Sequence, residues 1–282
     1  MYLFIMNHKK KYTIEMMCRV LEVSQSAYYN WQSGRSSTRE AQKKAIRSEI
    51  KRVFRLHRGH YGSPRIATEL GVSETTIRRH MKTLGLQSKR RKKHVATTDS
   101  KHDYLVCENI LNRRFDDHFP HGAWVSDITF IITTDGWLYM TTVIDLEDRK
   151  VIGWSFSKDL TAEETTIQAF TMAIKNRPPQ KGLIFHSDRG VQYGCYKFAN
   201  LLERHGITRS MSRKGNCWDN AVAESFFKTL KVELVYENPT ISREKMKILL
   251  FEYVETYYNK IRRHSALGNL TIDEFTKLKN VA

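Results

Sequence analysis

The chain has 282 residues, of which 40% are hydrophobic and 27% are charged, and its formal net charge is +17. This balance predicts a soluble globular protein of about two domains, and no apolar run approaches the roughly 18–20 residues of a membrane span. The four cysteines are scattered without a C-x-x-C pair, which favours reduced thiols in a cytosolic protein over a disulfide framework.

The positive charge is concentrated in the N-terminal third of the chain. Residues 1–94 hold 22 lysines and arginines against 6 acidic residues, whereas residues 95–282 hold 25 against 24. A basic module joined to a nearly neutral one indicates a phosphate-binding part attached to a part with another task. A basic tail that only improves solubility is the alternative.

Residues 1–37 form the first of two helix-turn-helix patterns. An apolar-periodic helix is expected to run to about Leu21, and Ser24 is expected to cap a second helix that ends near Trp31. This segment is less basic than the next one. Contacts with DNA and contacts with protein both remain open for it.

Residues 38–88 contain the second helix-turn-helix pattern. A basic amphipathic helix is predicted over residues 38–58. A further helix begins near Ser63 and stops at Gly71, which tolerates the left-handed conformation of a tight turn. Ser73 is then expected to cap the last helix, so that this segment is predicted to be a DNA-binding domain.

The last helix of this second pattern is the expected DNA-reading element. Its N-terminal residues would face base edges in the major groove, and the candidate contacts are Thr75, Thr76, Arg78 and Arg79. Residues 89–118 are predicted to be a basic linker whose first residues follow a phosphate backbone: Lys89, Arg90, Arg91, Lys92 and Lys93. A plain helical hairpin and a flexible spacer are the alternatives.

Residues 119–282 have the pattern of an α/β domain with a C-terminal helical extension. AWVSDITFI, GWLYMTTVID and KVIGWSFS predict three strands of an antiparallel meander. Next come a helix over 161–175, the strand GLIFHS, a helix over 193–205, the short strand ITRSMS and a helix over 220–234. This order predicts a ribonuclease-H-like fold, with a mixed sheet and helices on both of its faces.

Three acidic residues stand out within this domain. Asp127 lies in the middle of a predicted strand, where Asp is disfavoured. Asp188 follows a strand end, where active groups collect in α/β sheets, and Glu224 lies on a helix. If the three converge, they could hold two divalent ions that help to cut or join phosphodiesters. If they do not converge, they are ordinary surface acids.

The segments around these acids resemble a known family. WVSDIT, HSDRGVQY, SRKGNCWDNAVAESFFKTLK and YYNKIRRHSALG are similar to the motifs of the orfB-type transposases of the third family of bacterial insertion sequences. These are DDE transposases, which resemble retroviral integrases. The family places 35 residues between its second Asp and its Glu, as this chain does between Asp188 and Glu224. The resemblance covers essentially the whole chain.

The resemblance implies roles for individual residues. Asp127, Asp188 and Glu224 would be catalytic and would ligate two Mg²⁺ or Mn²⁺ ions, which favour oxygen ligands. Lys231 would contact DNA beside Glu224. For Lys228, which shares that helix face, an ordinary ion pair with Glu224 is the simpler interpretation.

The sequence thus predicts a DNA transposase that binds insertion-sequence ends and catalyses metal-dependent strand cleavage and strand transfer. Its expected partners are transposon-end and target DNA, further copies of itself in a synaptic complex, and an upstream-frame protein or fusion. It is expected in the bacterial cytoplasm, with the nucleoid. A metal-dependent nuclease of the same fold and a non-catalytic DNA-binding repressor are the alternatives. The end sequence is not predicted, because base recognition depends on docking geometry.

Overall fold

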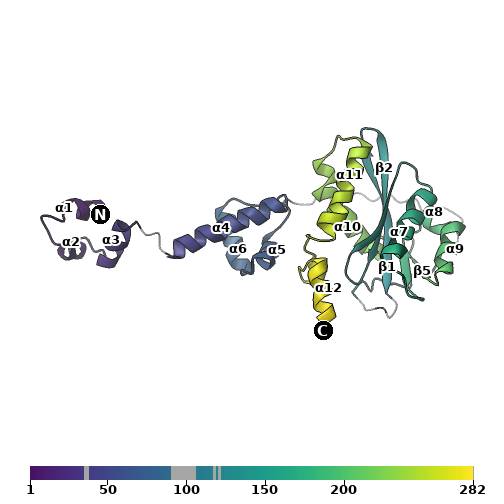
Figure 1. Ribbon diagram of the computed structural model, residues 1–282, viewed down its shortest axis with the longest axis horizontal. Coiled ribbons are helices and arrows are strands. Elements are labelled where there is room, and N and C mark those ends of the chain that lie inside the picture. The colour runs from purple at the N-terminus through teal and green to yellow at the C-terminus, as the bar shows by residue number, and fades with distance from the viewer. Residues whose placement is uncertain (35–37, 90–105, 117–118, 120–121, 282) are drawn as a thin grey trace. The chain divides into compact units, whose positions relative to one another are not determined.

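The protein forms two compact units, Met1–Lys89 and Arg90–Ala282. The computed structural model (Figure 1) describes residues 1–34, 38–89, 106–116, 119 and 122–281. Among these residues, no helix is long and apolar enough to cross a membrane. The finer domain boundaries predicted at residues 37, 88 and 118 stay predictions.

Three short helices form the N-terminal module of the first unit: α1 (Tyr2–His8), α2 (Ile14–Val20) and α3 (Gln25–Gln32). The second and third are the predicted pair, and the Ser24 hydroxyl caps α3 by accepting the Ala27 N–H at 3.2 Å. Helix α1 was not predicted, although its Ile5 is fully buried against Tyr28 and the α2 side chains.

The remaining helices of the first unit are α4 (Thr38–Leu56), α5 (Ser63–Leu70) and α6 (Glu74–Thr83). Gly71 ends α5 with a φ of 62°, as the turn required. The predicted capping by Ser73 is wrong in its detail. Ser73 stands at the N-cap position, but its hydroxyl donates to the Thr76 hydroxyl at 2.9 Å instead of accepting a backbone N–H.

A five-stranded mixed sheet with the order β3-β2-β1-β4-β5 organises the second unit. Strands β1, β2 and β3 form the predicted antiparallel meander, β4 pairs with β1 in parallel, and β5 pairs with β4 in parallel. The strands are β1 (Ala123–Thr133), β2 (Gly136–Asp145), β3 (Val151–Ser157), β4 (Ile184–Ser187) and β5 (Thr208–Met211).

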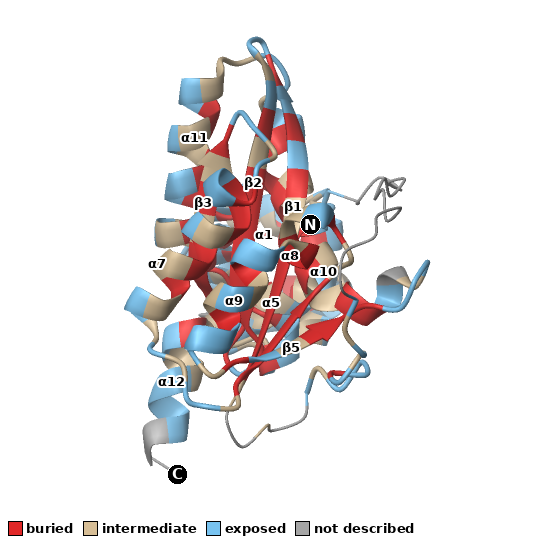
Figure 2. Cartoon of the chain, turned by 90° about the vertical axis from the view of Figure 1, so that its right-hand side faces the viewer, coloured by how far each residue is buried: buried red, intermediate tan, exposed pale blue. Residues whose placement is uncertain are grey.

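Helices cover both faces of this sheet, so the unit has three layers. On one face, α7 (Gln168–Asn176) and α9 (Tyr196–Arg204) pack on Trp124 and the side chains that share its face. On the other face, α10 (Ala221–Glu233) and α11 (Arg243–Glu252) pack on Val125 and its neighbours. Figure 2 shows the sheet largely as buried and the outer sides of α11 and α12 as exposed. The predicted ribonuclease-H-like fold class is confirmed.

The predicted helix over 193–205 differs from the structure. It is divided into α8 (Val191–Gly194) and α9, because Cys195 between them is extended, with a ψ of 147°. The helix predicted over 161–175 begins with the π-helical segment η1 (Glu163–Ile167) and continues as α7.

The C-terminal extension also contains more elements than predicted. Helix α11 continues as the π-helical segment η4 (Tyr253–Tyr258). The remaining elements of the second unit are η2 (Cys217–Asn220), η3 (Val235–Glu237), η5 (Ser265–Leu267) and α12 (Ile272–Val281).

Candidate active site

The strand register brings Asp127 and Asp188 level with each other. Parallel pairing of β1 with β4 matches Trp124 with Phe185 and Val125 with His186. Continuing this register by two residues places Asp127 beside Asp188, at the strand spacing of about 4.8 Å. Because paired residues of parallel strands point to the same side, both carboxylates lie on the same face of the sheet.

Glu224 comes to this face from helix α10. Val125 and Asp127 are two residues apart in β1, so their side chains point to the same face of the sheet. Val125 belongs to the core that contains Ala223 and Phe226 of α10, so this is the face that α10 covers. The Glu224 side chain is 27% exposed and lies in the first turn of that helix. The three predicted acids therefore converge on the covered face of the sheet.

The pKa of Asp127 reflects the acidic residues that lie near it. Burial raises the pKa of the Asp127 carboxyl well above its ordinary range, and the charges of Asp188 and Glu224 raise it further. The Ile128 N–H, which donates to its Oδ1 atom at 2.8 Å, lowers the same pKa. Burial also raises the pKa of Tyr193, and Asp127 and Asp188 add to that effect. The site is thus an accumulation of negative charge.

The donor set fits hydrated divalent cations. Three carboxylates supply oxygen ligands and mutual repulsion that a cation would offset. Thr142, which pairs with Asp127 across β2, has a buried hydroxyl without a partner among the described residues. In the described part of the chain, no three such side chains stand close enough to form a ready ligand cluster. The convergence rests on register and charge.

Two lysines of α10 lie near the carboxylates. The Lys228 ammonium pairs with Glu224 at 3.4 Å, so the simpler interpretation of Lys228 is confirmed. Burial lowers the pKa of Lys231, and the Asp127 charge opposes this shift. Lys231 therefore faces the site from the helix, while its predicted contact with DNA stays a prediction.

His186 and Asp219 lie in the motifs around Asp188 and Glu224, but sequence reasoning did not predict their partners. His186 is buried between the hydroxyls of Ser210 and Ser212, at 2.8 and 3.2 Å, and burial lowers its pKa to about 4. Asp219 is fully buried and pairs with Arg113 and Arg213. Asp219 lies within a quoted motif, but the sequence around Arg113 carries no signal of this pairing.

Asn220 lies at the start of the helix that carries Glu224. It occupies the N-cap position of α10 without a capping hydrogen bond from its side chain. Its Nδ2 atom instead donates to the Ser126 carbonyl at 3.0 Å.

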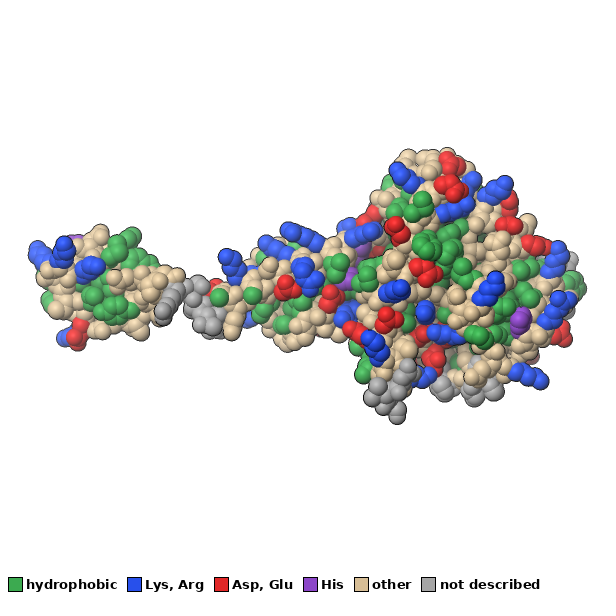
Figure 3. Space-filling view, viewed as in Figure 1, with side chains coloured by type: hydrophobic (Ala, Val, Ile, Leu, Met, Phe, Trp, Pro, Cys, Tyr) green, Lys and Arg blue, Asp and Glu red, His purple; other side chains and the backbone are tan. Residues whose placement is uncertain are grey.

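The predicted DNA-reading helix α6 has a mixed surface. Thr75, Arg78 and Arg79 are exposed, and Thr76 is half-buried. Arg78 pairs with Glu74 on the same helix. Figure 3 shows many lysine and arginine side chains over the module of α4, α5 and α6, whereas basic and acidic side chains are mixed over the surface of the second unit. Lys89 is exposed, and the other predicted backbone contacts, Arg90, Arg91, Lys92 and Lys93, lie outside the described residues.

The C-terminal arginines are structural where the structure describes them. Arg262 is buried and pairs with Glu233 of α10 at 2.8 Å. Arg263 pairs with Glu274 at 2.8 Å. These ion pairs fasten the C-terminal extension to itself and to the helix that carries Glu224.

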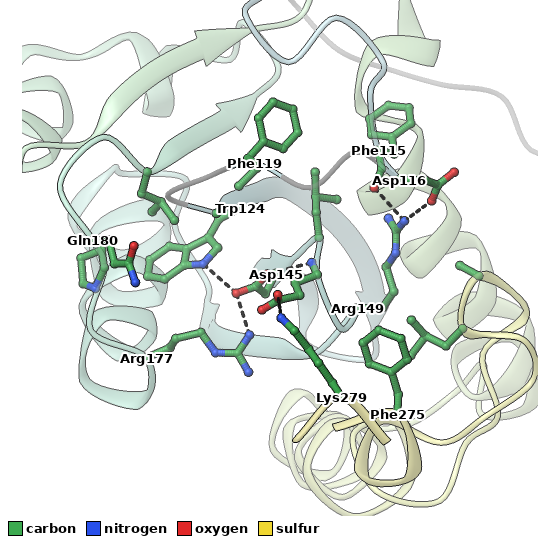
Figure 4. Close-up of a pocket in the computed structure, with 18 of the residues that line it drawn as sticks. Phe115, Asp116, Phe119, Trp124, Asp145, Arg149, Arg177, Gln180, Phe275 and Lys279 are labelled. Carbon is green, nitrogen blue, oxygen red and sulfur yellow. Dashed lines mark hydrogen bonds and ion pairs between the residues drawn. The ribbon is translucent and has the colours of Figure 1, made fainter. Parts of the chain in front are cut away.

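A pocket of about 640 Å³ lies at the other end of the sheet (Figure 4). It is lined by the beginning of β1, including Trp124, and by Leu183 just before β4, whereas Asp188 follows the far end of β4. The cations of its wall already pair with carboxylates: Arg177 with Asp145 at 2.6 Å, Arg149 with Asp116 at 2.5 Å, and Lys279 with Glu147. This pocket is separate from the carboxylate site.

A ribonuclease-H-like sheet with convergent acids, joined to helix-turn-helix modules, defines a polynucleotidyl transferase of the integrase type. Residues 117–217 and 205–271 match two integrase core domain families, and residues 41–94 match an HTH-like domain family. The chain belongs to the transposases of the IS3 family of insertion sequences. It is a DDE-type transposase.

Individual relatives match most or all of the chain, and a solved structure matches a smaller part of it. Transposase InsF for insertion sequence IS3A of Escherichia coli is 38% identical over 288 residues, covering 100% of this chain and 99% of the relative. The uncharacterized 31 kDa protein of insertion element IS600 from Shigella sonnei is 39% identical over 260 residues, covering 90% and 95%. The HTLV-2 integrase catalytic core domain in complex with magnesium aligns with a TM-score of 0.42 at 18% identity, covering 55% of this chain and 96% of that one.

Proposed function

We propose that Asp127, Asp188 and Glu224 are the catalytic carboxylates of this transposase and that they hold two divalent ions, Mg²⁺ or Mn²⁺. The observation that carries the proposal is the shared sheet face, on which the charges of Asp188 and Glu224 both raise the pKa of Asp127. Structural ion-pair networks usually match acids with bases, whereas this group sets acids against acids.

The residues of the site would divide the work as follows. Two strand carboxylates fix one side of the site on the rigid sheet, and Glu224 closes it from the helix. When bound, divalent ions supply the positive charge that activates an attacking oxygen and stabilises a leaving 3′-oxygen. Lys231 would hold a DNA phosphate near the triad, since its ammonium already lies within the field of Asp127.

We further propose that DNA is bound chiefly by the N-terminal unit and by the basic residues that directly follow it in the sequence. The catalytic part of the sequence is nearly neutral, so affinity for the transposon ends would come chiefly from the basic third. The proposed contacts are Thr75, Thr76, Arg78, Arg79, Lys89, Arg90, Arg91, Lys92 and Lys93. We further propose a synaptic homo-oligomer acting on the nucleoid in the cytoplasm, with an upstream-frame protein or fusion contributing to end binding.

The triad is tested with Asp188→Asn in the full chain. A labelled transposon end with a free 3′-hydroxyl is offered to target DNA with Mg²⁺, and joined products are resolved by electrophoresis. We expect the variant to lose joining and cutting while end binding in a mobility-shift assay persists. The exposed Asp273 provides the matched control, since Asp273→Asn removes one charge in the first turn of the C-terminal helix α12. Joining by Asp188→Asn at the control rate would refute the triad.

A further inference from the structure

We propose that Asn220 and the Arg113–Asp219 ion pair are positioning residues that hold Glu224 beside Asp127. This inference rests on the proposed carboxylate triad. It adds to the site three side chains that do not touch the reacting atoms and that act through the backbone on either side of the carboxylates.

Asn220 connects the two elements that carry Glu224 and Asp127. Its buried side chain donates from Nδ2 to the carbonyl of Ser126, the residue before Asp127, at 3.0 Å. Asn220 also lies four residues before Glu224, so both occupy one face of the helix start, one turn apart. This hydrogen bond therefore restrains the position of the start of α10 along β1, close to the three carboxylates.

Asp219 anchors the chain immediately before Asn220. Its fully buried carboxylate accepts from the Arg213 backbone N–H at 2.9 Å and from the Arg213 guanidinium at 2.8 Å through two nitrogens. The Arg113 Nε atom adds a hydrogen bond at 2.6 Å. The side-chain hydrogen bond from Arg213 leads the effects that hold the pKa of Asp219 far below its ordinary range. This carboxylate is already saturated by arginines, so it serves as an anchor and not as a metal ligand.

Arg113 brings a distant part of the chain to this anchor. It belongs to the strap, defined here as residues 106–113, which precedes β1 in the sequence. The Ile110 and Leu111 N–H groups donate to the Ser210 hydroxyl at 2.9 and 3.2 Å. The same hydroxyl contacts His186 at 2.8 Å, two residues before Asp188. The strap thus contacts Ser210, which bonds His186 near Asp188, and it contacts Asp219, which precedes the helix that carries Glu224.

Removal of Arg113 is expected to affect geometry more than folding. The Arg113 side chain is 43% exposed, and Asp219 would keep its contacts with Arg213. Loss of one ion-pair partner is severely destabilising when it leaves a buried charge unpaired. In Arg113→Ala, the buried Asp219 carboxylate would still be paired. What is lost is the restraint between the strap and the segment that leads into α10.

The test is calorimetric titration of the metal-free full chain with Mn²⁺, with wild-type protein, Arg113→Ala and Asn220→Ala. Supporting residues of metal sites typically change metal affinity or activity by 10–100-fold, so we expect affinity for Mn²⁺ to fall about tenfold in either variant. Cutting of end DNA at fixed Mn²⁺ should fall in kcat with little change in KM for DNA. Arg113→Lys should recover part of the loss.

The matched control is Arg243→Ala. Arg243 also joins segments about a hundred residues apart, through the Asp135 carbonyl in the β1–β2 turn, eight residues beyond Asp127. If Arg113→Ala and Asn220→Ala bind Mn²⁺ and cut DNA as this control does, the positioning role is refuted. If Asp188→Asn itself keeps wild-type Mn²⁺ affinity, the proposed triad fails, which is a separate result.

Discussion

Replacing Asp127 with Asn should stabilise the metal-free protein while abolishing its activity. Burial raises the pKa of the Asp127 carboxyl above the value for an unfolded chain, and the like charges of Asp188 and Glu224 raise it further. Above that unfolded value, ionisation of Asp127 costs stability. An Asn side chain keeps the shape and can still accept the Ile128 N–H, but it carries no charge.

The magnitude follows from the strand spacing. Two carboxylates about 5 Å apart repel by roughly 3 kcal/mol at an effective dielectric constant of about 20. Asp127 and Asp188 are only half-buried, and Lys231 offsets part of the repulsion. We therefore expect Asp127→Asn to gain about 1–2 kcal/mol. For a unit of this size, that raises Tm by roughly 2–8 °C.

The assay is thermal unfolding in chelator, followed by tryptophan fluorescence, since four of the five tryptophans lie in the catalytic unit. Asp219→Asn is the contrasting control, because Asp219 is buried and its hydrogen bonds with Arg213 hold its pKa far below the ordinary range, so its replacement should lower Tm. Saturating Mg²⁺ should then raise Tm for the wild type and not for Asp127→Asn. A lower Tm for Asp127→Asn in chelator would refute the reasoning.

The structure also predicts the outcome of three further substitutions. His186 is neutral when folded, with a pKa of about 4 against 6.5, so acidification from pH 7 to pH 4 should cost the wild type about 3 kcal/mol in urea unfolding. His186→Asn should lose less over that range, and equal slopes would contradict this. Gly153→Ala should destabilise by about 1–3 kcal/mol, because its Cβ would lie 2.2 Å from the Ala169 carbonyl oxygen. Wild-type stability of that variant in urea would be the opposing result. Arg79→Ala should weaken end binding by about 1–3 kcal/mol and relax the base preference at one position, and unchanged affinity for the ends would contradict a contact of Arg79 with base edges.

Local patterns were enough to predict the sheet and its layers. Alternating β-branched residues with short turns specify an antiparallel meander whichever tertiary contacts follow. Helix ends were also predicted correctly where a single local residue determines them: the Ser24 hydroxyl caps α3, and Gly71 adopts the left-handed conformation after α5. The three acids were noticed because each lies beside a recognisable strand or helix, and the resemblance to the transposase family supplied their catalytic roles, which stay a prediction.

The sequence could not predict interactions that depend on distant pairing. Asn220 at a helix start has the composition of an N-cap, yet the approach of β1 gives its amide a better acceptor in the Ser126 carbonyl. Arg113 lies in a loop with no periodicity, and its partner Asp219 is 106 positions away. The break at Cys195 and the π-helical segments likewise follow from packing, since helical propensity alone favours continuous helices there.

Burial alone does not distinguish a functional carboxylate in this protein. Asp145 and Asp219 are more deeply buried than Asp127, but arginines supply the opposite charge that holds each of them in place. The largest charge effects on Asp127 come from two other acids, and the balancing charge of Lys231 is the smallest contribution. The divalent cations proposed for this site would supply the opposite charge that the chain itself does not place beside Asp127. The sign of a buried acid's neighbours is therefore the feature that separates the site from its supports.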